Sequence, residues 1–325
     1  MKKMFSLVLA LMVSFGMVAC GIGSASAASQ STPITIRLSG AFAEGSEHYY
    51  YFETFCKSVN ERSGGSVTVV WGHGPEAIPS DQLAEAMQNG IVELVYTPIA
   101  YVVTVVPGLA GLKLTDPATM RKNGGFEYVD SLTMQKLNVH YLARTQDGSY
   151  FVLGMNMPIS GIADLKGKTI RGTSATKPII QSVGAEMVAM GWADVYQGLE
   201  KNVVQGAGGS LKDFVDNDLG AILKTVILPG AFNSDSSLLL ANHIWDKLDE
   251  AQRSALIQSA LDWEIDSLKH NTSGNEENIT ILETAGVKVV DLGKAYIEPA
   301  NEAAWAEVQA ADAAVAAELR KFAGN

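Results

Sequence analysis

Hydrophobic residues recur along the chain at two spacings, which predict an alternation of strands and helices. Residues 34–38 and 66–71 alternate apolar and polar side chains, as strands do, and residues 46–63 place apolar side chains on one helical face. A strand, a helix and a second strand in this order are typical of a parallel sheet. The pattern therefore predicts an α/β fold.

The same two spacings continue along the rest of the chain. Further strands are predicted at 94–97, 139–143, 150–153, 225–228, 237–241 and 287–290. Further helices are predicted at 80–89, 117–137, 178–190, 193–201 and 302–322, and residues 207–210 are expected to form a loop.

Residues 249–285 form the longest amphipathic stretch and contain no proline. A helix of this length would extend on the order of 50 Å, which exceeds one small domain. We therefore expect it to lie as a spine across two lobes that are linked by crossing strands. The first lobe would comprise residues 28–147 and 237–276, and the second lobe would comprise residues 148–236 and 277–325.

The N-terminus has the composition of a secretory signal peptide. Two lysines precede an apolar run, and Ala25-Ser26-Ala27 supplies a cleavage site of small residues. This pattern predicts that residues 1–27 are removed and that the protein works outside the cytoplasm. A lipid anchor on Cys20 is the alternative, because the residues that precede it resemble the lipobox of bacterial lipoproteins.

The composition excludes several classes of function. The 325 residues include 24 basic and 35 acidic side chains, a net charge of −11, and no block of basic residues. Nucleic acids and anionic membrane surfaces are therefore not expected as partners. The sequence contains no phosphate-binding loop, nucleophile elbow or zinc-binding helix motif, and its histidines are scattered. We expect a protein that is not an enzyme and needs no metal or cofactor; a hydrolase with an unfamiliar site is the alternative.

Arg171 is the main candidate for ligand binding. It ends a short β-branched run that follows Gly167, and the small residues 172–176 come after it. A guanidinium group offers a rigid fork of donors that matches a carboxylate, and small neighbours leave room for a ligand. A structural salt bridge of Arg171 is the alternative interpretation.

Five motifs occur in an order and spacing that are typical of one family. They cover residues 61–65, 81–93, 162–171, 193–206 and 245–255. Together they resemble the solute-binding proteins of tripartite ATP-independent periplasmic (TRAP) transporters of the DctP type. The resemblance implies a periplasmic binding protein fold without catalysis, whose lobes close on a small organic carboxylate. It also implies a monomer that delivers its ligand to the membrane subunits of a TRAP permease.

The resemblance assigns roles to several residues of the site. Arg171 stands where the family clamps the carboxylate, and Trp192 stands where an aromatic wall is common. Tyr150 and Tyr101 replace arginines of other members, and Gly209 replaces an asparagine. Fewer cations and more tyrosines favour a monocarboxylate with an apolar or aromatic remainder over a C4-dicarboxylate, which remains the alternative.

Other residues of the expected cleft are assigned with less detail. Glu76 lies in a glycine-rich loop that would shape the mouth, and Ser174 or Thr176 would donate hydrogen bonds to the ligand. Asp81 or Asp235 could receive an ammonium group, so that an amino acid or a sulfonate is also possible. A protein that passes its ligand to a two-component sensor kinase is the alternative to a transporter subunit.

Overall fold

The computed structural model describes residues 31–323. The predicted signal peptide, including Cys20, lies outside the described residues. Contacts separate Met1–Thr32 from Pro33–Asn325, and the helices and strands of the described chain all belong to the second unit. No helix among the described residues is long and apolar enough to cross a membrane.

The first sheet, sheet A, confirms the predicted parallel unit. Its strand order is β2-β1-β3-β10-β4, with bounds β1 Ile34–Gly40, β2 Val67–His73, β3 Leu94–Pro98, β4 Val139–Thr145 and β10 Ser236–Ala241. Strand β1 pairs in parallel with both β2 and β3, whereas β10 lies antiparallel between β3 and β4.

The second sheet, sheet B, has the strand order β11-β9-β5-β8-β6-β7. Its strands are β5 Tyr150–Met155, β6 Thr169–Gly172, β7 Glu186–Ala189, β8 Gly206–Ser210, β9 Thr225–Asn233 and β11 Lys288–Asp291. Strand β6 is parallel to its neighbours β7 and β8, and β5 is antiparallel to β8 and β9. The two sheets confirm the predicted α/β class.

Helices cover both faces of the sheets. The α-helices are α1 Phe52–Arg62, α2 Leu83–Gln88, α3 Pro117–Asn123, α4 Gly125–Leu137, α5 Lys177–Ser182, α6 Trp192–Glu200, α7 Leu211–Asp216, α8 Asn242–Trp245, α9 Glu250–Thr284, α10 Lys294–Ala311 and α11 Ala313–Phe322. Short 3₁₀ helices include η1 Glu47–Tyr49, η2 Ser80–Gln82, η3 Ile99–Tyr101 and η4 Pro107–Leu114.

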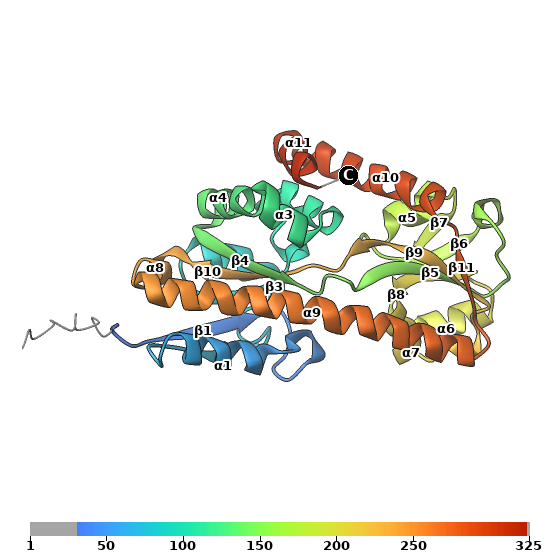
Figure 1. The fold of residues 1–325 in the computed structure, drawn as a ribbon. Helices are drawn as coiled ribbons and strands as arrows, with labels where there is room; N and C mark the ends of the chain where they lie inside the picture. The colour runs from blue at the N-terminus through green and yellow to red at the C-terminus, as the bar shows by residue number, and fades with distance from the viewer. Residues whose placement is uncertain (1–30, 324–325) are drawn as a thin grey trace, which may run out of the picture. The chain divides into compact units, whose positions relative to one another are not determined.

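Helix α9 confirms the predicted long helix and runs past both sheets (Figure 1). Asp249 starts it, because its carboxylate accepts a hydrogen bond from the backbone N–H of Gln252. The helix packs on α1 and β4 beside sheet A and on α7 and β11 beside sheet B. It therefore contacts both halves of the structure.

The two connections between the sheets, residues 146–149 and 234–235, are hydrogen-bonded to each other. The backbone N–H of Ser234 donates to the carbonyl of Ser149 at 2.7 Å, and that of Gly148 donates to Oδ1 of Asn233, the last residue of β9, at 3.2 Å. The side chain of Asn271 on α9 donates to the carbonyl of Asp147 at 2.9 Å. Both connections are thus fixed to each other, and one of them to α9.

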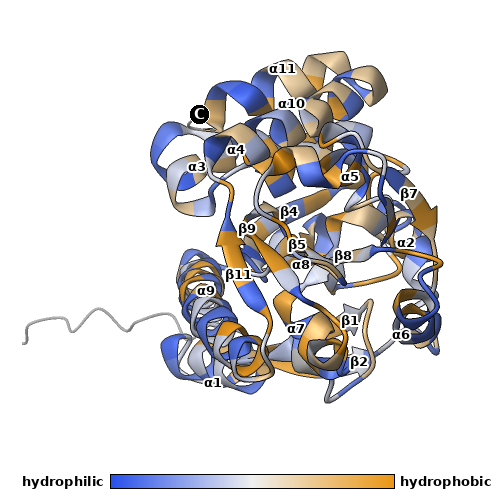
Figure 2. Ribbon diagram, turned by 90° about the vertical axis from the view of Figure 1, so that its right-hand side faces the viewer, coloured by the Kyte–Doolittle hydropathy of each residue, from blue (hydrophilic) through white to orange (hydrophobic). Residues whose placement is uncertain are grey.

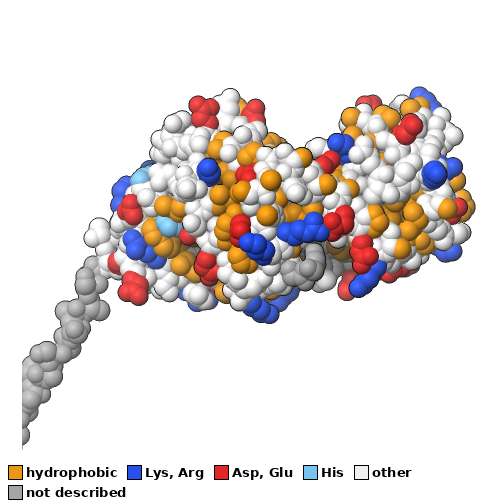
Figure 3. Space-filling view, turned by 90° about the horizontal axis from the view of Figure 1, so that it is seen from above, with side chains coloured by type: hydrophobic (Ala, Val, Ile, Leu, Met, Phe, Trp, Pro, Cys, Tyr) orange, Lys and Arg blue, Asp and Glu red, His pale blue; other side chains and the backbone are white. Residues whose placement is uncertain are grey.

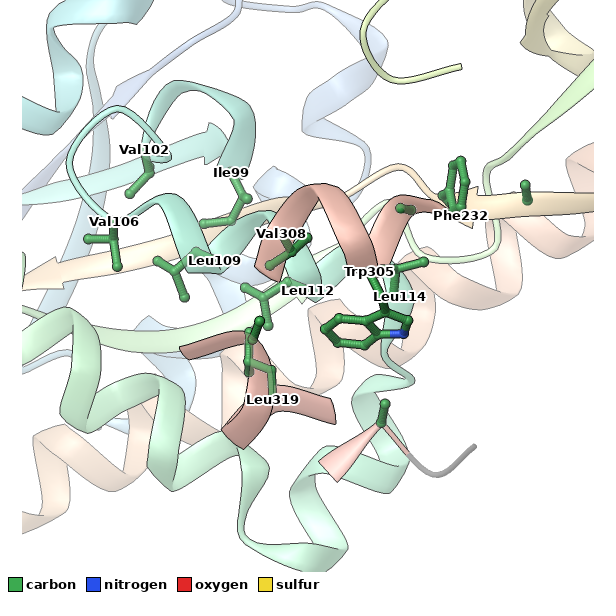
Figure 4. Packing of buried hydrophobic residues seen from close by; sticks show 14 of the residues in the cluster. Ile99, Val102, Val106, Leu109, Leu112, Leu114, Phe232, Trp305, Val308 and Leu319 are labelled. Atoms are coloured by element: carbon green, nitrogen blue, oxygen red, sulfur yellow. The ribbon is translucent and has the colours of Figure 1, made fainter. Parts of the chain in front are cut away.

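The hydrophobic core has three parts. One lies between sheet A and helices α1 and α9, and a second between sheet B and helices α6 and α7. The largest part includes residues of both sheets and is covered by η4, α5, α10 and α11 (Figure 4). Strand β9 is largely hydrophobic, whereas α9 and α10 carry hydrophobic and hydrophilic residues side by side (Figure 2).

Four element predictions are corrected by the structure. The helix expected at 178–190 ends at Ser182, and the residues after Gly184 form strand β7. The loop expected at 207–210 belongs to strand β8. The helices expected at 117–137 and 302–322 are each two helices, because Gly124 takes a φ of 90° and Asp312 caps a new helix.

Candidate functional site

Arg171 lies in β6 with only 4% of its surface exposed. Its Nε donates to the carbonyl of Met190 at 2.8 Å, and its Nη1 donates to the carbonyl of Gly208 at 3.0 Å. Burial lowers the pKa of Arg171, and the nearby carboxylate of Asp213 acts in the opposite direction. An arginine stays charged at physiological pH under such a shift. Neutral carbonyl groups therefore hold a buried positive charge.

Trp192 begins helix α6, and its ring lies 3.9 Å from Cζ of Arg171. A cation placed on an aromatic face in this way is attracted by the π electrons. The ring of Phe214 also contacts the indole, in an edge-on arrangement with a centroid distance of 6.4 Å. The guanidinium and the indole are thus fixed relative to each other.

Gly209 provides the space for the Trp192 ring. A Cβ atom at position 209 would lie 2.6 Å from Cη2 and 2.7 Å from Cζ2 of the indole. Any larger residue at position 209 would therefore displace the ring. The glycine and the tryptophan are consequently complementary in shape.

A cavity of about 220 Å³ adjoins this cluster and is lined from both sheets. Sheet A contributes Tyr96 and Thr145, sheet B contributes Phe151 and Ser210, and α9 contributes Trp263. The surface of the molecule is also notched between the part that contains sheet A, on the left of Figure 3, and the part that contains sheet B. The cavity thus lies between the two sheets. Arg171, Trp192 and Gly209 are not among its lining residues, whereas Asp213 is.

Asp213 connects the Arg171 cluster to this cavity. Its Oδ2 accepts hydrogen bonds from the backbone N–H and the hydroxyl of Ser210, both at 2.8 Å, and Ser210 in turn caps helix α7. The same Oδ2 lies 3.2 Å from the Cβ position of Gly209. Sequence analysis missed Ser210 and Asp213, although a serine followed three residues later by an acid is a recognisable capping box.

Gln146 is a second residue of the cavity that sequence analysis missed. Its amide lies 2.9 Å from His48 Nδ1 and accepts a hydrogen bond from Ser234 Oγ at 3.0 Å. Its backbone has a φ of 63°, which is uncommon for a residue with a side chain. The side chain joins η1 to both connections between the sheets, and no local sequence signal indicates this contact.

Tyr150 lies at the start of β5 and is half-buried. Its ring packs on the backbone of Gly230, where a Cβ atom would lie 1.9 Å from Cδ2 of the tyrosine. Tyr150 does not line the cavity beside Ser210; it lines a separate cavity together with Lys113.

The remaining predicted residues lie outside the Arg171 cluster. Tyr101 ends η3 with 37% of its surface exposed, and Ser174 is exposed in the loop after β6. Asp81 is exposed in η2. Glu76 is also exposed, and a hydrogen bond from the backbone N–H of Gly74 at 2.7 Å lowers the pKa of its carboxyl group. None of the four lines the cavity beside Ser210.

The chain matches the family model of the bacterial extracellular solute-binding proteins, family 7 (DctP), over residues 38–313. A solute-binding protein of Albidiferax ferrireducens is 22% identical over 284 residues, which is 82% of each chain. The "Monocarboxylate 2-oxoacid-binding periplasmic protein" of a Nostoc species is 21% identical over 262 residues, covering 77% of this chain and 71% of the relative.

Solved structures show the same fold. A TRAP periplasmic solute-binding protein from Rhodobacter sphaeroides, in an apo open form, matches with a TM-score of 0.78 at 18% identity, covering 89% of this chain and 98% of the other. One from Desulfovibrio salexigens with bound orotic acid matches with a TM-score of 0.68 at 19% identity, covering 89% and 96%.

The two-sheet α/β fold with a cavity between the sheets is the fold of the solved periplasmic solute-binding proteins that this chain resembles. The chain belongs to family 7 of the bacterial extracellular solute-binding proteins, the DctP family of TRAP transporters. The family binds organic acids and is not enzymatic, which confirms the predicted resemblance and the absence of catalysis.

Proposed function

We propose that this protein captures a small monocarboxylate with an apolar or aromatic remainder and delivers it to a TRAP permease. Arg171 would bind the carboxylate, and Trp192 would pack against the body of the ligand. The proposal rests mainly on the buried guanidinium of Arg171, which has no ion-pair partner among residues 31–323.

The hydrogen bonds of Arg171 leave donors for a ligand. Nε and Nη1 are engaged by two carbonyl groups, and Nη2 has no hydrogen-bond partner among residues 31–323. A buried charge without a counter-ion is unfavourable, and a carboxylate would supply both the charge and the acceptors. The chemistry of Arg171 therefore favours an anionic ligand.

Two observations favour one carboxylate over two. Trp192 occupies the space in which a side chain at position 209 would lie. The apolar indole therefore stands where the asparagine of other family members would offer a polar contact. Lys212 lines the adjacent cavity, but it forms an ion pair with Asp216 at 2.9 Å. The ligands of two similar proteins, a monocarboxylate 2-oxoacid and orotic acid, support the same class.

Isothermal titration of the purified protein with phenylpyruvate, benzoate and succinate tests this proposal. We expect the aromatic monocarboxylates to bind more tightly than succinate, and Arg171→Ala to weaken their binding by at least about tenfold because it removes a charge-assisted hydrogen bond. Arg62→Ala is the matched control, since Arg62 pairs with Asp262 on the surface. Tighter binding of succinate, or equal affinity of the Arg171→Ala variant, would contradict the proposal.

A further inference from the structure

A second cavity, of about 250 Å³, lies between η4, strands β5 and β9, and helix α10. Lys113, Tyr150, Phe232, Asn233 and Asn301 contribute its main side chains. None of its lining residues lines the cavity beside Ser210, and neither Arg171 nor Trp192 reaches it. It is therefore a separate space in the molecule.

Lys113 places a positive charge in this cavity. Its side chain is half-buried, and no carboxylate of residues 31–323 forms an ion pair with it. Burial lowers the pKa of Lys113, while the negative charges of Asp235 and Glu307 act in the opposite direction. Glu307 is itself paired with Lys177 at 3.2 Å. A bound anion would compensate the cost of removing this ammonium group from water.

Phe232 gives the cavity an apolar wall next to this cation. The ammonium nitrogen of Lys113 lies 5.0 Å from the centre of the phenyl ring. Phe232 is buried and has a φ of 52°, a left-handed backbone conformation that is unfavourable for a bulky residue. Such conformations persist only where the surrounding structure enforces them, and they cluster at ligand sites.

Hydrogen-bond donors surround the same space. Asn233 Oδ1 accepts from the backbone N–H of Gly148, and its amide nitrogen, a donor, has no hydrogen-bond partner among residues 31–323. The hydroxyl of Tyr150 and the amide of Asn301 are further donors among the lining residues. Asp116 is an acidic residue of the lining, and it caps α3. Its Oδ1 accepts hydrogen bonds from the backbone N–H of Thr119 at 2.7 Å and from the hydroxyl of Thr119 at 2.6 Å.

We propose that this cavity is a second binding site, for a small carboxylate with a flat apolar body. Lys113 pairs with the carboxylate, Tyr150 and Asn233 donate hydrogen bonds to it, and Phe232 contacts the body of the ligand. The volume suits an acid of benzoate size and is smaller than the pockets of drug-sized ligands, which begin at about 300 Å³. The proposal does not depend on the ligand of the Arg171 site.

The test uses benzoate and the full protein with Arg171→Ala, which removes the cation of the first site. We expect this variant to retain weak benzoate binding in saturation-transfer NMR titrations. Adding Lys113→Met should raise the dissociation constant at least about tenfold, because a charge-assisted contact is lost. Adding Lys113→Arg keeps the cation, and adding Lys122→Met changes an exposed lysine of α3; both should stay within about threefold.

Two results would overturn the proposal. One is the absence of benzoate binding by the Arg171→Ala variant, and the other is an unchanged dissociation constant after Lys113→Met. Tyr150→Phe, which removes only the hydroxyl, provides a second test if Lys113→Met lowers the unfolding temperature. It should weaken benzoate binding by about threefold to tenfold, in line with the loss of one hydrogen bond, and an unchanged constant would count against the site.

Discussion

At the scale of single residues, the proposed ligand site depends on a match between a tryptophan and a glycine. Trp192 covers the guanidinium of Arg171 on one side, and Gly209 leaves the space that the indole needs. The contact between Arg171 and Trp192 thus depends on Gly209, a residue that has no side chain. A substitution at Gly209 should therefore affect ligand binding through Trp192.

We predict that Gly209→Ala weakens binding of an aromatic monocarboxylate by about tenfold, because the new methyl group forces the indole out of contact with Arg171. Titration gives the affinity, and tryptophan fluorescence reports the changed environment of the ring. Gly191→Ala is the matched control, since a Cβ atom there meets nothing within 4 Å. Unchanged affinity in Gly209→Ala would show that the ring position is not critical.

At the scale of elements, the C-terminal helices form an extensive contact with η4. Two glycines of η4, Gly108 and Gly111, allow this close approach. A Cβ atom at 108 would lie 2.3 Å from Cβ of Val315, and one at 111 would lie 2.9 Å from the ring of Trp305. Because α10 also packs on α5 beside sheet B, this contact helps to join the two halves of the molecule.

Gly108→Ala should therefore lower the free energy of unfolding by about 1–3 kcal/mol, the usual cost of overpacking a well-filled core. Urea denaturation followed by circular dichroism measures this change. Gly161→Ala should stay within about 0.5 kcal/mol, since Gly161 has an extended backbone and open space around its Cβ position. Equal stability of the two variants would mean that α11 shifts without cost.

The sequence predicts elements well where a side-chain pattern exists. The alternation at 34–38 and the amphipathic stretch at 249–285 correspond to β1 and α9. Strand β8 has the sequence Gly-Ala-Gly-Gly-Ser, which has no such pattern, and its extended form results from its pairing with β5 and β6. Strand β7 is a largely exposed edge strand, so its residues do not alternate between buried and exposed positions.

The candidate site could be predicted only in part, because a local sequence pattern marks some of its residues and not others. Arg171 stands in a recognisable motif, and the structure places it against Trp192 and the carbonyl of Gly208, while its role in ligand binding stays a prediction. The lining of the cavity combines Tyr96, Ser210 and Trp263, which lie far apart in the sequence. Only the pairing of the strands brings these segments together, and no local pattern encodes it.

At the scale of the whole molecule, buried charges gather where the sheets are connected. Arg144 forms a bidentate ion pair with Asp147, with bonds of 2.8 and 2.7 Å. Asp235, in the other connection, has an Oδ2 that is buried without a hydrogen-bond partner in the described structure. Burial raises the pKa of Asp235 to about 6, although Arg144 and Lys113 act against this shift.

This shift predicts how stability depends on pH. Because the pKa of Asp235 is higher in the folded state than in the unfolded state, folding favours the protonated form. Its contribution to the free energy of unfolding should be complete below about pH 4 and lost as pH rises through about 6. Asp235→Asn should flatten this part of the stability curve and raise stability at pH 7.

Thermal unfolding of the wild type and Asp235→Asn between pH 4 and 7 measures the effect. Asp81→Asn is the control, because Asp81 is exposed in η2 and should leave the curve unchanged. A curve for Asp235→Asn that runs parallel to that of the wild type would contradict the prediction.

The position of β10 in sheet A has a consequence for the order of folding. This strand lies between β3 and β4, and it is separated from both by about a hundred residues or more of sequence. Sheet A cannot be completed before residues 236–241 are available, and contacts between such distant segments form slowly. A chain synthesised from its N-terminus therefore stays incompletely folded for most of its synthesis.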